Sequence, residues 1–229
     1  MPLPYRTALI VGAGAGISAS LARALAKEGL KLGLAARNPD KLADLAAETS
    51  AATFAVDVAD PAGVAALFTQ MDRRLGEPDM VLFNASARVR GSVLDIDPQA
   101  VRGALEVSAF GGFLVAQQAA RRMVPHGRGA ILFTGASASV KGYPLSSSFA
   151  MGKFALRGLA QSTARELGPK GIHVAHFVID GAVGSAARPD MDDATLDPDG
   201  IAQTYMDVLR QPRNAWSFEV ELRPWVETF

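Results

Sequence analysis

Short apolar runs alternate with longer amphipathic segments along the whole chain, and this alternation limits the folds available to it. The runs have the length of strands buried on both faces, whereas the amphipathic segments repeat their apolar residues with a helical period. An order of strand, helix, strand, helix favours a parallel sheet with helices on both faces. We therefore expect a three-layer α/β/α fold of about seven parallel strands, at residues 7–11, 31–35, 52–56, 80–83, 130–133, 174–179 and 217–222.

Several helices carry clear start signals. An Asn or Asp side chain can accept hydrogen bonds from free amides at a helix start, and Pro loses nothing in the first turn. This pair occurs at four places where an amphipathic segment begins, namely residues 38–39, 60–61, 97–98 and 197–198. We expect a helix to begin at each of them.

Composition narrows the class of protein. The 229 residues are 49% hydrophobic and 20% charged, which allows one domain over residues 1–229 to bury a core. The 23 basic and 23 acidic side chains cancel, so nothing favours nucleic acid or a membrane surface. The chain has no cysteine, which excludes disulfides and thiolate metal sites. Residues 1–7 lack the pattern of a signal peptide, and no apolar run approaches the ~20 residues of a membrane span, so a cytoplasmic location is the default expectation.

A glycine-rich turn separates the first expected strand from the first helix. Residues 12–18 read GAGAGIS, with glycine at Gly12, Gly14 and Gly16. Such glycines let the backbone approach a pyrophosphate, which the amides and dipole at the helix start then hold. The G-x-G-x-x-G spacing is not met, because Ile17 takes the third glycine position; G-x-x-x-G-x-G fits better, with Ser18 in place of the last glycine. The position between strand and helix favours a dinucleotide site over a plain tight turn.

Further motifs follow in the order and spacing of a known family. Residues 57–58 (DV) follow the third expected strand, residues 84–87 (NASA) follow the fourth, and residues 153–156 (KFAL) and 171–174 (GIHV) come later. Together with the glycine turn they resemble the short-chain dehydrogenase/reductase family over nearly the whole chain. The resemblance implies a single-domain Rossmann fold and an oxidoreductase that binds a nicotinamide dinucleotide.

The resemblance also assigns cofactor-binding residues. It places Asp57 and Val58 against adenine and gives Lys153 a role at the nicotinamide ribose. The other positions that it assigns to the cofactor are Gly12, Gly14, Gly16, Ile17, Asn84, Ala85, Ser86, Gly181 and Val183.

The charge at the end of the second strand bears on the choice of cofactor. NAD-binding versions of this fold carry a carboxylate there, whereas a 2′-phosphate calls for a cation. Residues 35–38 read AARN, with no acid and with Arg37, whose planar fork suits a phosphate. We expect NADP(H) rather than NAD(H); the alternative is that Arg37 merely sits on a solvated turn.

The catalytic positions are unusual. Family members use a tetrad of Asn, Ser, Tyr and Lys, in which Tyr exchanges the proton and Lys lowers its pKa. Carried over by position, Lys falls on Lys153, Tyr on Phe149, Ser on Ala136 and Asn on Ser108. Only the lysine is retained.

Two functional hypotheses follow. The first is an oxidoreductase acting on an unknown carbonyl or alcohol, with a water or a loop hydroxyl as proton donor; Ser137, next to the lost serine, and the phenol Tyr143 are candidates. The second is a catalytically silent NADP(H)-binding sensor or partner subunit. Non-redox chemistry on the same scaffold is a third, more remote reading.

Two further expectations concern metals and assembly. His173 and His176 are three apart on an expected strand and point to opposite faces, so we expect no metal site. Residues 98–124 and 148–167 carry enough Ala, Leu and Gly to pack closely, and family members pair such helices between subunits. We expect a homodimer or homotetramer.

Overall fold

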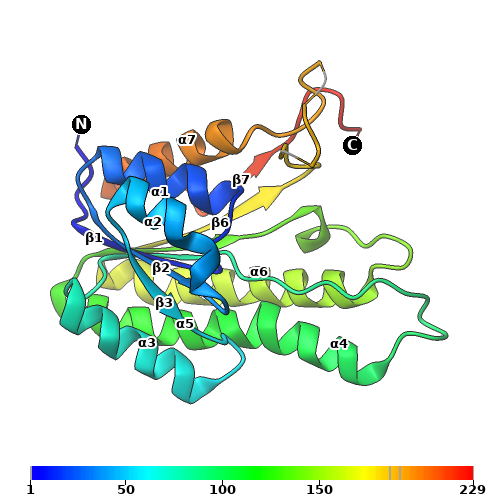
Figure 1. Ribbon diagram of the computed structural model, residues 1–229, viewed down its shortest axis with the longest axis horizontal. Coiled ribbons are helices and arrows are strands. Elements are labelled where there is room, and N and C mark those ends of the chain that lie inside the picture. The colour runs from blue at the N-terminus through cyan, green and yellow to red at the C-terminus, as the bar shows by residue number, and fades with distance from the viewer. Residues whose placement is uncertain (1, 186, 191, 229) are drawn as a thin grey trace.

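A seven-stranded parallel sheet forms the centre of the computed structural model, with strand order β3-β2-β1-β4-β5-β6-β7 (Figure 1). The structure describes residues 2–185, 187–190 and 192–228. Met1 and Phe229, the ends of the expected domain, lie outside the described residues, as do Ala186 and Met191. The expected fold class is confirmed. The strands are β1 (Thr7–Val11), β2 (Lys31–Ala36), β3 (Ala52–Ala55), β4 (Met80–Phe83), β5 (Gly129–Thr134), β6 (Ile172–Ile179) and β7 (Glu219–Leu222).

Helices cover both faces of this sheet. In Figure 1, α1, α2 and α7 lie on one face and α3, α4, α5 and α6 lie on the other. Each layer buries its own apolar core, with Phe177 stacked on Tyr205 in one and Phe83 edge-on to Phe133 in the other. The helices are α1 (Ile17–Lys27), α2 (Ala43–Thr49), α3 (Pro61–Arg74), α4 (Pro98–Leu105), α5 (Gly111–Met123), α6 (Ser147–Leu167) and α7 (Pro198–Leu209). No helix in the described part of the chain is both long enough and apolar enough to cross a membrane.

The four expected helix starts are confirmed. Asp60, Asp97 and Asp197 accept hydrogen bonds from the amides two residues on, at the beginnings of α3, α4 and α7. Asn38 does the same for Asp40, but the helix that it caps is a 3₁₀ turn over Pro39–Leu42 that leads into α2.

Every expected strand is present, and most of their limits differ by no more than one residue. The largest differences are at β6, which begins at Ile172, and at β7, which begins at Glu219. Ser217 lies outside β7 because side chains satisfy its backbone groups. Its amide donates to Gln211 Oε1 (2.7 Å), and its carbonyl contacts His173 Nε2 (2.9 Å).

The strand order reverses at β1, which lies between β2 and β4. Val11, the last residue of β1, stands opposite both Ala35 and Phe83, so the turns that follow these strands meet at one edge. Ligands of open α/β sheets bind in the crevice at such a switch point, outside the carboxyl ends of the strands. The fold therefore gathers the glycine turn, the end of β2 and the turn after β4 in one place.

The helix expected over residues 98–124 is interrupted. A π-helical turn over Glu106–Phe110 joins α4 to α5. Within it Ser108 is buried, and its Oγ accepts a hydrogen bond from the Ala87 amide (3.0 Å). Beyond the turn, a Cβ on Gly112 would come within 2.6 Å of Leu156, so glycine allows α5 to pack closely against α6.

Candidate functional site

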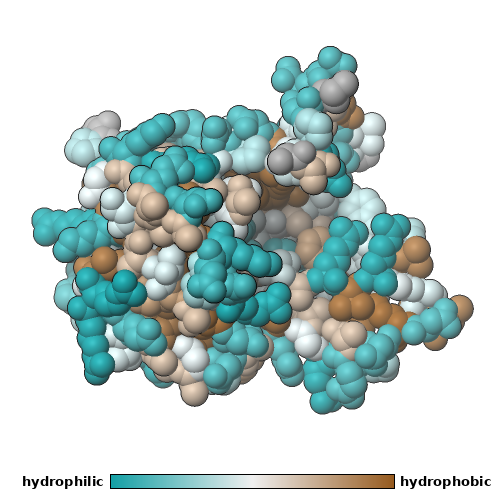
Figure 2. Space-filling model, in the orientation of Figure 1, coloured by the Kyte–Doolittle hydropathy of each residue, from teal (hydrophilic) through white to brown (hydrophobic). Residues whose placement is uncertain are grey.

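Two cavities adjoin each other at the carboxyl edge of the sheet. The larger has a volume of about 750 Å³ and the smaller about 350 Å³. Asn84 and Ser86, from the turn after β4, line both. Figure 2 shows the surface hollowed between the segment that projects after β6 and the helices below it. An extended ligand can therefore reach from one cavity into the other.

The glycine turn forms one wall of the large cavity and is held by Asn84. The Asn84 Nδ2 donates to the Gly12 carbonyl (3.3 Å) and to Ser18 Oγ (2.8 Å). Gly12 has a φ of +83°, and a Cβ there would lie 2.3 Å from the Ala85 amide nitrogen, so only glycine fits. A Cβ on Gly14 or Gly16 would meet open space. Those two positions are therefore free of packing demands and leave room for a ligand.

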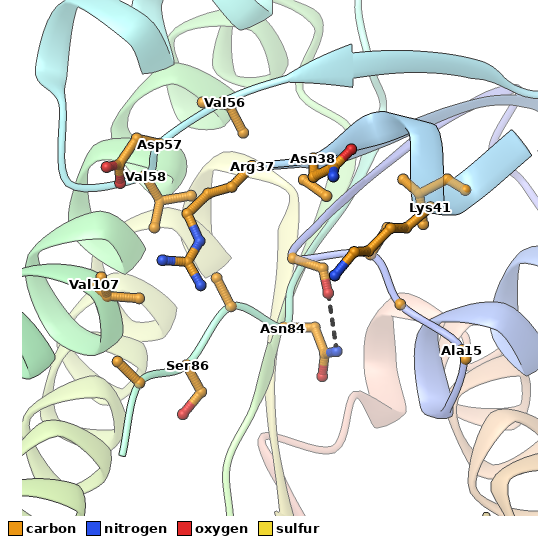
Figure 3. A pocket seen from close by; sticks show the side chains of 17 residues that line it. Ala15, Arg37, Asn38, Lys41, Val56, Asp57, Val58, Asn84, Ser86 and Val107 are labelled. Atoms are coloured by element: carbon orange, nitrogen blue, oxygen red, sulfur yellow. Dashed lines mark hydrogen bonds between the residues drawn. The ribbon is translucent and has the colours of Figure 1, made fainter. Parts of the chain in front are cut away.

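Two cations reach into the large cavity. Arg37 extends from the end of β2 toward Val58 and Ser86, and Lys41 extends from the 3₁₀ turn toward the glycine turn (Figure 3). The sequence analysis identified Arg37 but missed Lys41. Lys41 could have been found from the sequence, because it is a cation four residues after Arg37 and lies in a turn that begins at Asn38 and Pro39. The Asp57 carboxylate accepts from the Ala59 amide (3.0 Å) and points away from the guanidinium in Figure 3.

The expected cofactor residues divide between the two cavities. The large one is lined by Gly12, Gly14, Arg37, Asp57, Val58, Asn84, Ala85 and Ser86. The small one is lined by Ile17, Asn84, Ser86, Lys153, Gly181 and Val183. Gly16 precedes the first residue of α1 and is not among the lining residues of either.

Lys153 is a buried cation in the lining of the small cavity. Its side chain is 3% exposed, and its Nζ donates to the Thr134 carbonyl (2.8 Å). Burial lowers the pKa of Lys153 from its usual 10.5 to about 8. An ammonium group carries three N–H donors. The Nζ can therefore donate to a ligand as well as to Thr134.

Phe149 lies within cation–π distance of two cations. The Lys153 Nζ lies 5.8 Å from the centroid of its ring, and the Arg88 guanidinium carbon lies 5.2 Å from the same centroid. Ala136 and Ser137 line the same cavity. The structure thus brings together Lys153, Phe149 and Ala136. Ser108, the fourth tetrad position, is not among the lining residues of this cavity; its Oγ bonds to the Ala87 backbone, and its Cβ lies against Gly152 of α6.

A buried carboxylate lies beside the small cavity, and the sequence analysis gave it no role. Asp180 is 1% exposed and forms ion pairs with Lys141 (3.1 Å) and Arg223 (2.9 Å). Burial raises the pKa of Asp180, but Ser137 and these cations more than offset that effect, so the pKa is below its ordinary value. The carboxylate therefore stays charged and fixes the start of the segment that supplies Gly181 and Val183.

The two strand histidines have separate partners. His173 stacks on Trp216, with ring centroids 4.7 Å apart. The His176 Nδ1 lies 3.0 Å from Glu219 Oε2, and burial lowers its pKa to about 4, so it is neutral at pH 7. Among the described residues, no three His, Asp or Glu side chains gather as a metal site requires.

The fold and the glycine turn define a doubly wound α/β protein of the dinucleotide-binding type. A family model described as short chain dehydrogenase matches residues 6–193. The chain belongs to this family, whose members are oxidoreductases that use a nicotinamide dinucleotide.

Three comparisons illustrate the relationship. An uncharacterized oxidoreductase of Staphylococcus aureus (strain N315) is 28% identical over 231 residues, covering 97% of this chain and 98% of its own. The crystal structure of a short-chain dehydrogenase from Rhodopseudomonas palustris is 36% identical with a TM-score of 0.84, covering 96% and 99% of the two chains. An alcohol dehydrogenase from Thermococcus sibiricus, complexed with 5-hydroxy-NADP, is 24% identical with a TM-score of 0.88, covering 97% and 98%; it shares the fold.

Proposed function

We propose that the protein is an NADP(H)-dependent oxidoreductase that interconverts a carbonyl compound and its alcohol, with Lys153 as the proton donor. The observation that carries this proposal is the junction of the two cavities. One combines a glycine turn with two cations, and the other ends at a buried amine. Relatives named as oxidoreductases favour turnover over a silent cofactor-binding role.

The large cavity suits the adenine half of the cofactor. The glycine turn offers backbone amides to the pyrophosphate, and the open space beside Gly14 and Gly16 lets it approach. Arg37 and Lys41 supply the positive charge that a 2′-phosphate requires, where NAD-binding proteins carry an acid. Asp57 and Val58 line the part of the large cavity that the pyrophosphate and the 2′-phosphate do not fill. We assign this part to the adenine.

The small cavity takes the nicotinamide end and the substrate. Bound NADPH supplies a hydride. The chain must supply the proton, and neither Ala136 nor Phe149, at the positions of the family serine and tyrosine, has a hydroxyl. The Lys153 Nζ is buried, holds a proton below pH about 8 and has N–H bonds to spare. It holds the substrate oxygen and passes it the proton.

The other candidate donors are less suited to this role. The Ser137 side chain lies close enough to the Asp180 carboxylate to lower its pKa, so the hydroxyl proton is drawn toward Asp180. Tyr143 is 46% exposed and interacts with Lys141, so its phenol is engaged near the solvent. Of these three candidates, Lys153 is the one that is buried.

Calorimetric titration with NADPH and NADH tests the cofactor part of the proposal. The wild type is expected to bind NADPH at least about tenfold more tightly, because a charge-assisted contact to phosphate contributes about 1.5–3 kcal/mol. Arg37→Ala and Lys41→Ala should each reduce this preference. Lys31→Ala removes an exposed cation at the opposite end of β2 and is the matched control. Equal affinity of the wild type for both cofactors would contradict the NADP(H) assignment.

A further inference from the structure

The small cavity is positively charged. Its lining includes Arg88 and Lys153 and contains no Asp or Glu side chain. The other lining residues are apolar or neutral, with Phe149, Ile179 and Val183 among the apolar ones. Lys153 is buried, so solvent screens its charge poorly, whereas Arg88 is exposed and presents its guanidinium both to solvent and to the cavity.

Arg88 is held in position, yet it has no acidic partner in the described part of the chain. Its Nη2 donates to Ser146 Oγ (3.1 Å), and its guanidinium lies over the Phe149 ring. Neither Arg88 nor Lys153 takes part in any ion pair found among residues 2–185, 187–190 and 192–228. Two arginines that are less exposed than Arg88 do have such partners, namely Arg122 with Asp72 and Arg157 with Glu219. The Arg88 guanidinium can therefore bind the anionic group of a ligand, since no carboxylate among the described residues pairs with it.

Phe149 acquires a role in this arrangement. An aromatic face stabilises a stacked guanidinium and leaves its N–H edge free to bind a carboxylate through two parallel hydrogen bonds. The same ring also contacts the amine, so the guanidinium and the Lys153 Nζ both lie within 6 Å of one ring centroid.

We propose that the substrate is an oxo acid, whose carboxylate binds Arg88 while its carbonyl oxygen meets the Lys153 Nζ. This inference rests on the proposed function and names its substrate class. In the reduction a hydride adds to the carbonyl carbon, the C=O π bond breaks and the Nζ proton moves to the oxygen. The products are a hydroxy acid, NADP⁺ and a neutral amine that regains its proton from water.

The test compares each acid with a neutral partner that keeps the same carbonyl. The pairs are levulinate with methyl levulinate, acetoacetate with methyl acetoacetate and, as the phosphate arm, dihydroxyacetone phosphate with dihydroxyacetone. The ratio of kcat/KM for acid over neutral partner is measured with NADPH for the wild type, Arg88→Leu and Arg88→Lys. Arg90→Leu, which removes an exposed cation two residues away and outside the cavity lining, is the control.

The wild type should prefer the carboxylate by about fivefold, the upper end of the range for a charge pair with a solvent-exposed partner. Arg88→Leu should bring the ratio close to one, Arg88→Lys should keep part of it, and Arg90→Leu should keep all of it. A preference that survives Arg88→Leu would overturn the inference, and so would equal use of acid and ester by the wild type. Preference for the phosphate over the carboxylates would overturn the oxo-acid assignment.

Binding measurements separate this inference from the proposed function. Levulinate is titrated into the NADP⁺-bound protein, and NADPH into each variant. If no ketone turns over but levulinate binds in an Arg88-dependent way, the anion site stands and the oxidoreductase proposal fails. If ketones turn over at rates that do not depend on Arg88, the oxidoreductase proposal stands and the anion site at Arg88 fails. A loss of NADPH affinity in Arg88→Leu equal to the loss for levulinate would assign Arg88 to the cofactor and overturn the inference.

Discussion

The Nζ atom of Lys153 lies 5.8 Å from the centroid of the Phe149 ring, one turn earlier on α6. A phenol at that position would share a proton with the amine, but a phenyl ring has none to share. The amine instead meets an apolar face in a buried site, which lowers its pKa to about 8. A general acid works best when its pKa is near the working pH. The loss of the hydroxyl thus leaves the lysine better suited to act itself.

The first prediction concerns pH. The amine donates a proton only while it is charged, so the kcat for reduction should be level below pH about 8 and fall as pH rises through it. Oxidation of the alcohol needs the neutral amine and should rise over the same range. His176, the titratable neighbour whose pKa is about 4, stays neutral there and adds no second step. A kcat for reduction that stays level up to pH about 10, where a phenol titrates, would contradict the role of Lys153.

The second prediction restores the usual acid. Phe149→Tyr with Ala136→Ser places a phenol one turn from Lys153 and a hydroxyl beside the substrate. Reduction of neutral ketones and quinones should rise, but by less than the roughly 10²- to 10⁴-fold that a positioned general acid contributes, because Lys153 already donates the proton in the wild type. Phe154→Tyr, which adds a phenol on an exposed part of α6, is the control and should change little. If the double variant gains nothing while still binding NADPH, the assignment of these two positions to the tetrad is wrong.

The third prediction concerns assembly, for which we propose a homodimer or homotetramer. Four large apolar side chains, each 42–50% exposed, lie on the π turn, α5 and α6: Phe110, Phe113, Met151 and Phe154. Phe110 and Phe113 stack with centroids 6.2 Å apart. Burying such side chains between subunits removes apolar surface from water. Light scattering at micromolar concentration should show an oligomer that Phe113→Glu dissociates, whereas Leu94→Glu, on a separate exposed loop, should not. A monomeric wild type would contradict this assembly.

Local sequence signals were sufficient for the architecture. The alternation of strand and helix, together with caps such as Asp60 and Asp97, acts within a few residues of the chain, so the order of elements could be read directly. The place of Gly12 in a ligand-binding turn could also be predicted, because the turn joins an expected strand to an expected helix. The close approach of Gly12 to Ala85 explains the glycine, but only the fold shows that contact.

The parts of the site that sequence analysis missed depend on contacts between distant segments. Arg88 becomes a candidate anion-binding residue because its guanidinium lies over the ring of Phe149, which is 61 positions later in the sequence. Asp180 is defined by Lys141 and Arg223, which come from other segments. The π turn at Ser108 has no local signal, since its partner is the Ala87 backbone. Such contacts arise from tertiary packing, and the periodicity of apolar residues along the sequence does not predict them.

The most direct test of the central claim follows the hydride. The protein is incubated with levulinate and NADPH that carries deuterium at the transferred position, and the hydroxy acid is analysed by mass spectrometry. The expected product carries a single deuterium on the carbinol carbon. With cofactor saturating, Lys153→Met should form it about 10²- to 10⁴-fold more slowly. An NADPH-saturated protein that transfers no deuterium to any oxo acid or ketone, or a Lys153→Met variant as fast as the wild type, would contradict the account.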